Sequence, residues 1–350
     1  MKKIIIDKSE DGIKFIKYLK NIFKEMPDSL IYKLIRKKYF KINGKIANTK
    51  DVLKTDDSIE VYLSEDTFNK FYNYKTKSLE NSVKKNKINI DEIKKNIVYE
   101  DNNLIIFNKW QGILSQDNGS GDISLNKLLN EYLQFKNHTN IKENELNNKT
   151  KDNTESTIKN SYNFIPSVVN RLDRNTEGLI IFAKTYLFSR EISKMISENR
   201  MEKYYITIVN GKVQNKTGEL VNLYKKDEKN NIAIIKDIDD NVNNDFSVVK
   251  LKYKVIDNND NFSLLDIKLI TGKSHQIRAQ LSYINHPIIC DKKYMNKELY
   301  EKNIQTFTFK NQKLMCYSIL FSNFENNDLK YLSNKKFEIY NNYRGIYDEI

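Results

Sequence analysis

Apolar residues recur at helical spacing in two short segments near the start of the chain. In residues 12–24 they predict an amphipathic helix with its apolar face at Ile13, Ile16, Leu19, Ile22 and Phe23. A second helix is predicted directly after Pro27, with Asp28 or Ser29 as its N-cap. The apolar face of this helix comprises Leu30, Ile31, Leu34 and Ile35.

Strand patterns follow these two helices. Tyr39–Ile42 and Lys45–Ile46 flank Asn43-Gly44, a dipeptide typical of a tight hairpin turn. Residues 58–63 alternate between polar and apolar side chains and predict a further strand. We therefore expect a small first domain over residues 1–64.

The second part of the chain carries longer strand patterns. Residues 179–183 form an apolar run typical of a buried strand, and strands are also predicted within 98–112, 203–211 and 262–270. After the last of these, Thr271 or Ser274 is a candidate N-cap for a helix. The positions of that helix expected to face the core are Ile277, Leu281 and Ile284.

Two polar segments rich in Lys and Asn lack such periodicity. Residues 65–90 are interpreted as a linker between the first domain and a second domain over 91–350. Residues 136–163 are interpreted as a flexible surface insertion in the second domain, because they carry too few apolar side chains to fold alone.

The charge of the chain narrows its possible functions. A formal net charge of +13 indicates nucleic acid or an anionic membrane surface as a partner, although a composition rich in Lys, Asn and Ile can also reflect the base composition of a genome. Residues 1–64 hold 15 Lys and Arg against 9 Asp and Glu, so the first domain is a basic module. A membrane-surface role is disfavoured because no basic amphipathic helix with Trp or Phe anchors is evident.

Several other classes are also disfavoured. Cys290, Cys316 and three scattered histidines lack the number and spacing of a disulfide framework or a zinc site. The N-terminus does not fit a signal peptide, and no stretch approaches the ~20 apolar residues of a membrane span. We expect a cytoplasmic protein without a metal or cofactor.

The segment 170–178, Asn-Arg-Leu-Asp-Arg-Asn-Thr-Glu-Gly, is the most informative in the chain. It places Asp173 between Arg171 and Arg174, immediately before the predicted strand 179–183. A loop at a strand edge is a common place for a catalytic side chain, and nearby arginines favour the ionised carboxylate. Gly178 indicates a turn or a close backbone approach. The alternative is a structural Asp in a surface ion-pair network.

The first domain resembles the S4 RNA-binding domain in the stretches Ser29–Arg36 and Lys41–Gly44. The resemblance implies RNA-phosphate contacts by the cationic residues in and after the second helix, namely Lys33, Arg36, Lys37, Lys38 and Lys41. The alternative is a solvated cationic face.

Four stretches of the second domain, 98–112, 170–178, 203–211 and 271–278, resemble in this order the RluA-type pseudouridine synthases. The layout, including Asn118–Gly121, is most similar to the large-ribosomal-subunit type C. The resemblance implies an α+β protein, with a small S4-like α/β domain followed by a catalytic domain. That domain would contain a mixed, largely antiparallel sheet flanked by helices.

The same resemblance implies roles for individual residues. Asp173 matches the catalytic aspartate, and Arg278 matches the arginine that pairs with it. Arg171 matches the arginine that replaces the flipped uridine in the RNA stack, with Arg174 also on the RNA path. Tyr205, rather than Tyr204, matches the tyrosine that packs on the target base. The RNA pocket around them would comprise Thr271, Gly272, Lys273, His275 and Gln276.

The chain departs from the family pattern at Asn170, Glu177 and Trp110, where the family usually has His, Ser and Pro. Glu177 would add a second carboxylate near the RNA path. The implied reaction is isomerisation of uridine in RNA, with Asp173 as nucleophile or general base and the target base flipped out of its stack. The expected partner is 23S rRNA, bound by a monomer. The alternatives are the same reaction on tRNA, and a non-catalytic RNA-binding or ribosome-assembly protein.

Overall fold

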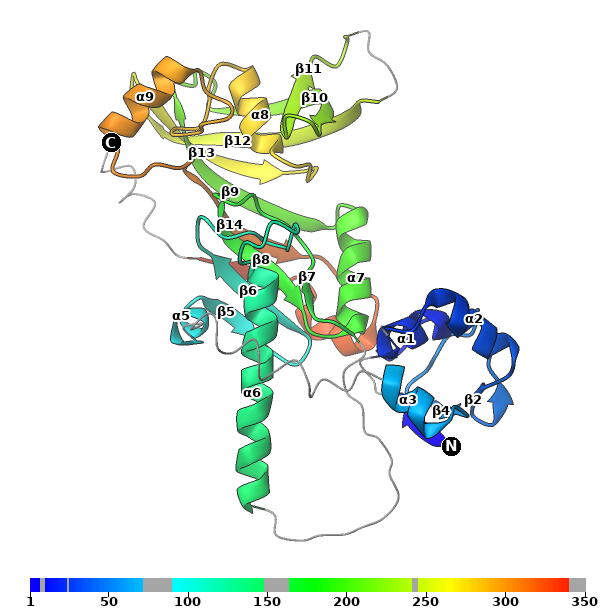
Figure 1. The fold of residues 1–350 in the computed structure, drawn as a ribbon. Helices are drawn as coiled ribbons and strands as arrows, with labels where there is room; N and C mark the ends of the chain where they lie inside the picture. Colours follow the sequence, from blue (N-terminus) through cyan, green and yellow to red (C-terminus); the bar gives the residue numbers. More distant parts are fainter. Residues whose placement is uncertain (7–9, 24, 72–89, 148–163, 241–244, 340–350) are drawn as a thin grey trace.

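The computed structural model describes residues 1–6, 10–23, 25–71, 90–147, 164–240 and 245–339. Its N-terminal part is a four-stranded sheet in the order β1-β4-β2-β3, packed against three helices (Figure 1). The elements are β1 (Lys2–Ile5), α1 (Phe15–Ile22), α2 (Asp28–Arg36), β2 (Phe40–Ile42), β3 (Lys45–Ile46), β4 (Ser58–Val61) and α3 (Glu65–Phe71).

The two predicted helices and the hairpin are confirmed. Asn43 and Gly44 have φ angles of 50° and 78°, the paired positive values that a type I′ hairpin turn requires. The core beneath the sheet includes Phe15 and Phe40, whose ring centroids lie 5.9 Å apart. Burial of these aromatic rings is the main stabilising contribution expected in so small a domain.

Two boundary predictions in this region are wrong. Helix α2 is capped by the backbone at Pro27, so Asp28 lies in the first turn and neither it nor Ser29 is the N-cap. A carboxylate there still favours the helix through the dipole. The predicted linker 65–90 begins with helix α3, and Phe68 of that helix is buried in the N-terminal core. Residues 72–89 lie outside the described residues.

The second part of the chain forms an eleven-stranded sheet with helices on its faces. The strands are β5 (Ile97–Glu100), β6 (Leu104–Lys109), β7 (Ser167–Val168), β8 (Glu177–Ala183), β9 (Met201–Asn210), β10 (Thr217–Asp227), β11 (Ile232–Lys236), β12 (Ser247–Asn258), β13 (Phe262–Leu269), β14 (Leu314–Phe321) and β15 (Lys336–Glu338). The helices are α5 (Ile90–Lys95), α6 (Leu125–Asn147), α7 (Tyr186–Ser197), α8 (Gln276–Tyr283), α9 (Lys297–Thr306) and the 3₁₀ helix η2 (Asn327–Leu332).

The sheet is mixed and largely antiparallel, as predicted. Its main order is β11-β10-β12-β13-β9-β14-β8-β6-β5, with β15 paired to β14 and β7 paired to β8. Among these described strands only β14 and β8 run parallel, and they pair over just two positions, from Met315 to Glu177 and from Cys316 to Gly178. Helices α8 and α9 lie over one end of the sheet and α7 over the other (Figure 1). The α+β architecture is therefore confirmed.

The predicted insertion at 136–163 is partly wrong. Helix α6 continues from Leu125 through to Asn147, so the first half of the segment is helical. Polar composition excludes an independent core, but it does not prevent a helix from extending beyond its packed first turns. Residues 148–163 lie outside the described residues.

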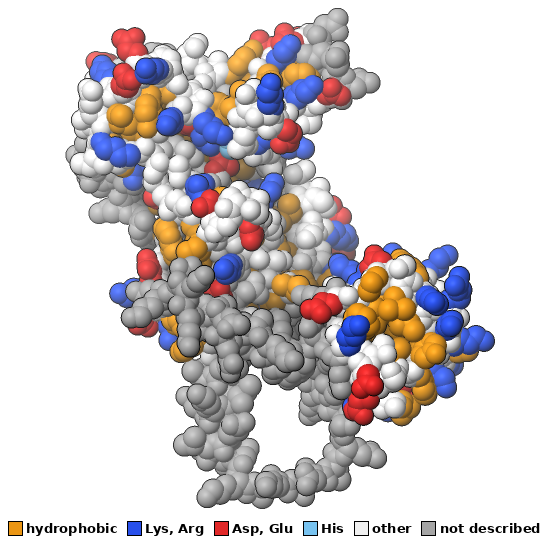
Figure 2. Space-filling model, in the orientation of Figure 1, with side chains coloured by type: hydrophobic (Ala, Val, Ile, Leu, Met, Phe, Trp, Pro, Cys, Tyr) orange, Lys and Arg blue, Asp and Glu red, His pale blue; other side chains and the backbone are white. Residues whose placement is uncertain are grey.

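The N-terminal domain lies beside α7, away from α8 (Figure 1). Tyr186, the first residue of α7, packs against the N-terminal core, and the Lys17 ammonium lies 5.2 Å from the centre of its ring. Lys and Arg side chains gather on the outer side of this domain (Figure 2). No helix in the described ranges is long and apolar enough to cross a bilayer.

Candidate active site

Asp173 lies in the loop that leads into β8, as predicted. Lys109, a fully buried residue at the end of β6, binds the backbone of this loop. The Lys109 Nζ donates to the carbonyls of Trp110, Ile113 and Arg174 at 3.0, 3.2 and 2.9 Å. Burial lowers the pKa of Lys109 to about 8, and the negative charges of Asp173 and Glu177 partly oppose this shift. Lys109 thus fastens the backbone of the Asp173 loop to the sheet.

Gly178 allows β8 to approach β14 closely. Its φ is 108°, and a Cβ at this position would lie 2.2 Å from the carbonyl oxygen of Cys316. Any larger residue would push β8 and β14 apart directly behind the Asp173 loop. The predicted close backbone approach is therefore confirmed.

Arg278, on α8, joins two carboxylates. Its Nη1 donates to the Asp173 Oδ2 at 2.8 Å, while its Nε and Nη2 donate to the two Asp291 oxygens at 2.7 and 2.8 Å. Burial alone lowers the pKa of Arg278, but the hydrogen bonds and charges of Asp291 and Asp173 outweigh it and raise that pKa above its ordinary value. The guanidinium therefore stays charged and directs one N–H donor at the Asp173 carboxylate.

Neither flanking arginine forms an ion pair with Asp173 that can be identified among the described residues. Arg174 turns to Asp122 instead, with an Nη2–Oδ2 distance of 2.5 Å, and Arg171 is exposed. Arg278 instead approaches Asp173 from a separate helix, α8. The ion-pair partner of Asp173 is thus 105 residues away in sequence.

Tyr205 is buried in β9, where it pairs with Cys316 of β14. Burial raises the pKa of Tyr205 well above its ordinary value, with further increases from Cys316 and from the charge of Asp173. The phenol therefore remains protonated at physiological pH. Tyr204 points to the other side of the strand and donates to Glu202 at 2.6 Å, so Tyr205 is the tyrosine that lies on the Asp173 side.

The loop before α8 is organised around His275. The predicted N-cap at Thr271 or Ser274 is wrong, because His275 itself occupies the cap position with a left-handed φ of 57° and without a side-chain cap bond. Its Nδ1 lies 2.9 Å from the Tyr294 hydroxyl, and its Nε2 lies 3.8 Å from the Asp173 Oδ2. Burial lowers the pKa of His275 to about 4, so the ring is neutral at physiological pH.

Other predicted pocket residues have different positions in this loop. Gln276 is buried and fixes the loop, since its Oε1 accepts from the Thr271 hydroxyl at 2.9 Å and from the Lys273 backbone N–H at 3.1 Å. Gly272 and Lys273 are exposed at the surface. Ile277, Leu281 and Ile284 pack against the main core, as predicted.

The predicted RNA-binding residues of the N-terminal domain fall into two groups. Lys33, Arg36 and Lys38 line a groove between α2 and the segment Ile46–Thr49. Lys37 is exposed next to them, whereas Lys41 lies over the Tyr62 ring at 5.1 Å. Helix α2, which carries Lys33 and Arg36 of this groove, lies on a different part of the molecule from α8 (Figure 1).

Sequence reasoning missed three residues that shape the site. Asp291 is fully buried and holds Arg278 through both carboxylate oxygens. Tyr294 lies against the Arg278 guanidinium, 5.1 Å from its ring centre, and Lys109 holds the Asp173 loop. A lysine at the end of an apolar strand and an aspartate directly after the apolar run Ile288–Cys290 were the available signals, because charges in such positions are buried only when paired.

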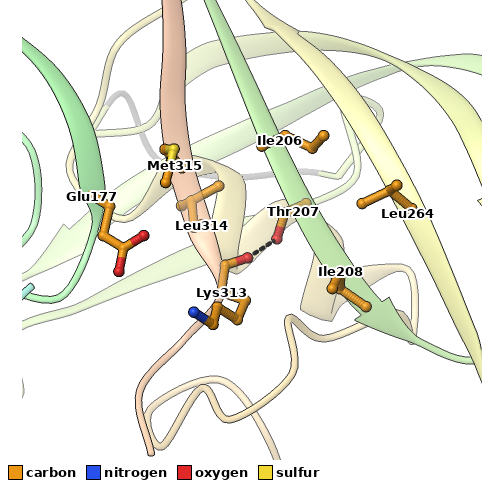
Figure 3. A pocket seen from close by; sticks show the side chains of 8 residues that line it. All are labelled: Glu177, Ile206, Thr207, Ile208, Leu264, Lys313, Leu314 and Met315. Carbon is orange, nitrogen blue, oxygen red and sulfur yellow. Dashed lines mark hydrogen bonds between the residues drawn. The ribbon is translucent and has the colours of Figure 1, made fainter. Parts of the chain in front are cut away.

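The three departures from the family pattern occupy defined places. Asn170 accepts a hydrogen bond from the Ile181 backbone at 2.7 Å, and Trp110 packs on Phe107. Glu177 lines a mostly apolar pocket (Figure 3), in which the Thr207 hydroxyl donates to the Lys313 carbonyl at 2.7 Å. Glu177 therefore lies at the junction of β8 and β14, and not in the loop that carries Asp173.

Comparison with known proteins identifies the class to which this site belongs. The model of the RNA pseudouridylate synthase family matches residues 103–283. The chain is 30 % identical over 348 residues to an uncharacterized RNA pseudouridine synthase of Mycoplasma capricolum subsp. capricolum, covering 96 % of each. It is 30 % identical over 287 residues to ribosomal large subunit pseudouridine synthase C of Buchnera aphidicola subsp. Baizongia pistaciae, covering 81 % of this chain and 77 % of that protein.

The solved structure of human RNA pseudouridylate synthase domain containing 4 aligns with a TM-score of 0.48 at 16 % identity, covering 66 % of this chain and 86 % of that chain. The family match and the relative from Mycoplasma capricolum show that the chain belongs to the RNA pseudouridylate synthase family. It is an enzyme that isomerises uridine to pseudouridine in RNA.

Proposed function

We propose that the chain modifies large-subunit ribosomal RNA and that Asp173 is its catalytic carboxylate. The assignment of Asp173 rests on the Arg278 guanidinium, which bridges two carboxylates. Its Nη1 lies 2.8 Å from the Asp173 Oδ2, and its other nitrogens bind the buried Asp291. A loop carboxylate paired with a fixed guanidinium is suited to act on the target nucleotide as nucleophile or as general base. The large-subunit substrate is supported by the relatives named for that activity.

Tyr205 and Arg171 complete the proposed chemistry. The target uridine leaves its stack at a cost of a few kcal/mol. Stacking of its base on Tyr205 would offset that cost by ~1–3 kcal/mol, and the exposed Arg171 is available to occupy the vacated place in the RNA. The Tyr205 hydroxyl, kept protonated by its raised pKa, would serve as a proton donor on the Asp173 side of β9.

The N-terminal domain is proposed to bind RNA through its basic groove. Lys33, Arg36 and Lys38 lie around one concave surface, where a phosphate backbone can be contacted by several cations together. We propose that the chain divides into an S4-like domain and a catalytic domain. The first domain includes helix α3 and so extends to Phe71 instead of residue 64, and the catalytic domain begins at Ile90. The enzyme is further proposed to act as a cytoplasmic monomer that needs no cofactor.

The substrate is tested with RNA that carries tritium at uridine C5, because isomerisation exchanges that hydrogen. Wild-type enzyme is expected to release tritium from 23S rRNA, and substantially less from bulk tRNA at equal uridine concentration. Release from tRNA alone would overturn the proposed substrate while leaving the enzyme class intact. A precursor ribosomal particle serves as a third substrate, because bound ribosomal proteins can hold the RNA around the target uridine in the shape that the enzyme recognises.

A further inference from the structure

Two lysines from separate segments converge on one neutral residue near the active site. The Lys226 Nζ, at the end of β10, donates to the Asn231 Oδ1 at 2.6 Å. The Lys293 Nζ, in the turn after Asp291, donates to the Asn231 backbone carbonyl at 2.9 Å. We call Lys226 and Lys293 the lysine pair. Among the described residues, the ion pairs that can be identified join neither ammonium to a carboxylate.

The lysine pair is held in place by the architecture of the active site. The Lys226 Nζ also lies 3.4 Å from the Ser274 hydroxyl, in the loop that precedes α8. The Tyr224 hydroxyl donates to the Ser274 carbonyl at 3.1 Å, and the Ala233 backbone N–H donates to the Tyr294 hydroxyl at 2.6 Å. The β10–β11 hairpin is therefore fastened to both segments that flank Arg278, so little ordering is needed for the pair to receive a ligand.

The charges around the lysine pair are unbalanced. Asp173 and Asp291 carry two negative charges against the one positive charge of Arg278, so the two ammonium groups bring this cluster to a net charge of +1. Burial lowers the pKa of Lys293, the positive charges of Arg278 and Lys226 lower it further, and the negative charges of Asp173 and Asp291 partly oppose this shift. Asp227, next to Lys226, directs its carboxylate to Asn230 at 2.7 Å. A ligand anion would relieve this repulsion and gain two charge-assisted hydrogen bonds.

We propose that the lysine pair binds a phosphodiester group of the RNA strand beside the nucleotide that enters the Asp173 site. The inference rests on the proposed function, because the nucleotide at Asp173 brings its own backbone phosphates within a few ångströms of its sugar. Lys and Arg side chains line the hollow beside the lobe that carries the β10–β11 hairpin (Figure 2). The pair positions the strand as two point charges and does not read its sequence.

The chain offers a charge-matched control for this site. Lys225 precedes Lys226 but points to the other side of β10, where its Nζ lies 3.0 Å from the Asp245 Oδ2. Lys292 precedes Lys293 and is exposed. The double variant Lys226→Ala/Lys293→Ala removes the lysine pair, and the double variant Lys225→Ala/Lys292→Ala is its control. Both remove the same net charge from the same two segments.

The experiment measures the Kd of a large-subunit rRNA fragment at several salt concentrations for wild type and both doubles. Because the two lysines share one phosphodiester group, its loss is expected to reduce the slope of log Kd against log salt by about 0.7–0.9 in Lys226→Ala/Lys293→Ala. The control double is expected to keep the wild-type slope within about 0.5. Equal slopes in the two doubles would overturn the proposal. Thermal melting shows that each variant is folded before binding is measured.

Two further measurements complete the test. The first distinguishes binding of an RNA phosphodiester from binding of a free anion, and the second tests the proposed substrate separately from the phosphate site. Inorganic phosphate could raise the melting temperature only when the lysine pair is present, while the slope of log Kd against log salt for RNA is the same with and without the pair. In that case the site binds a free anion and the proposal fails. Tritium release is measured on the same samples. Wild type that binds RNA with the predicted difference in slope but releases no tritium would refute the proposed substrate and leave the phosphate site standing.

Discussion

Asp291 holds Arg278 in a fixed orientation, with Nε–Oδ2 and Nη2–Oδ1 distances of 2.7 and 2.8 Å, and this leaves Nη1 directed at Asp173. Asp291 is fully buried, so it orients the guanidinium without competing for substrate. Its Oδ1 also accepts from the Lys293 and Tyr294 backbone N–H groups at 3.0 and 3.3 Å. Arg278 is thus pre-organised to pair with Asp173 before RNA arrives.

Replacement of Asp291 by Asn tests this orientation. An amide has one acceptor oxygen, so one bond to Arg278 is lost and an NH₂ group is set against an N–H donor. We expect a loss of about 3–5 kcal/mol in the free energy of unfolding, because the change breaks a buried ion pair. In variants that remain folded, kcat is expected to fall more than KM rises, as measured by tritium release.

The control is Asp260→Asn, which removes a carboxylate that is 92 % exposed and 3.1 Å from Lys212. Exposed pairs contribute about 0–1 kcal/mol, so the stability of this variant should remain close to wild type. A stable, fully active Asp291→Asn enzyme would show that Asp291 does not orient Arg278.

Tyr205→Phe separates stacking from proton transfer. The ring is retained, so RNA affinity should stay within about threefold, while loss of the hydroxyl should lower kcat by about tenfold or more if it takes part in proton transfer. Tyr204→Phe, on the other side of β9, should leave both quantities unchanged. Unchanged kcat in Tyr205→Phe would restrict the residue to packing against the base.

His275 makes stability depend on pH. Its pKa is about 4 in the folded protein against an ordinary value of 6.5, so the unfolded chain takes up the proton first as pH falls. Stability is therefore lost progressively between pH ~6.5 and ~4. His275→Asn suits the left-handed backbone and removes this titration. Between pH 7 and 5 the melting temperature should fall less in the variant, and an equal fall would contradict the buried neutral ring.

The basic groove of the N-terminal domain is tested by Lys33→Ala/Arg36→Ala. Loss of two phosphate contacts should weaken RNA binding and lower the salt slope by about 1.4–1.8, with kcat at saturating RNA unchanged. Lys2→Ala/Lys14→Ala removes the same charge from positions outside the groove, on β1 and before α1. Equal slopes in both doubles would indicate that the groove residues form only a solvated cationic face.

Periodicity in the sequence predicted the elements more reliably than their ends. The Asn43-Gly44 turn and the strands that carry Gly178 and Tyr205 follow from local patterns, and the structure confirms them. The N-caps at Ser29 and Ser274 failed because the chain enters each helix by backbone geometry alone, through Pro27 and a left-handed His275. Short polar residues before a helix allow a cap without requiring one.

Contacts across the site could not be predicted from local pattern. The pairing of Arg278 with Asp173 was predicted only through resemblance to the family, since 105 residues separate them. Asp291, Tyr294 and the lysine pair meet only because the β10–β11 hairpin folds back onto the loop before α8. Such contacts depend on the register of distant strands, which no local period encodes.

The role of Asp173 is tested most directly by comparing Asp173→Asn with Asp122→Asn and wild type in tritium release from C5-labelled rRNA. Asp122 is the exposed partner of Arg174, so its amide variant controls for the loss of one charge near the same loop. We predict no release by Asp173→Asn, with RNA affinity within a few-fold of wild type, and near-normal release by Asp122→Asn. Sustained release by a folded Asp173→Asn enzyme would contradict the assignment of Asp173 as the catalytic carboxylate.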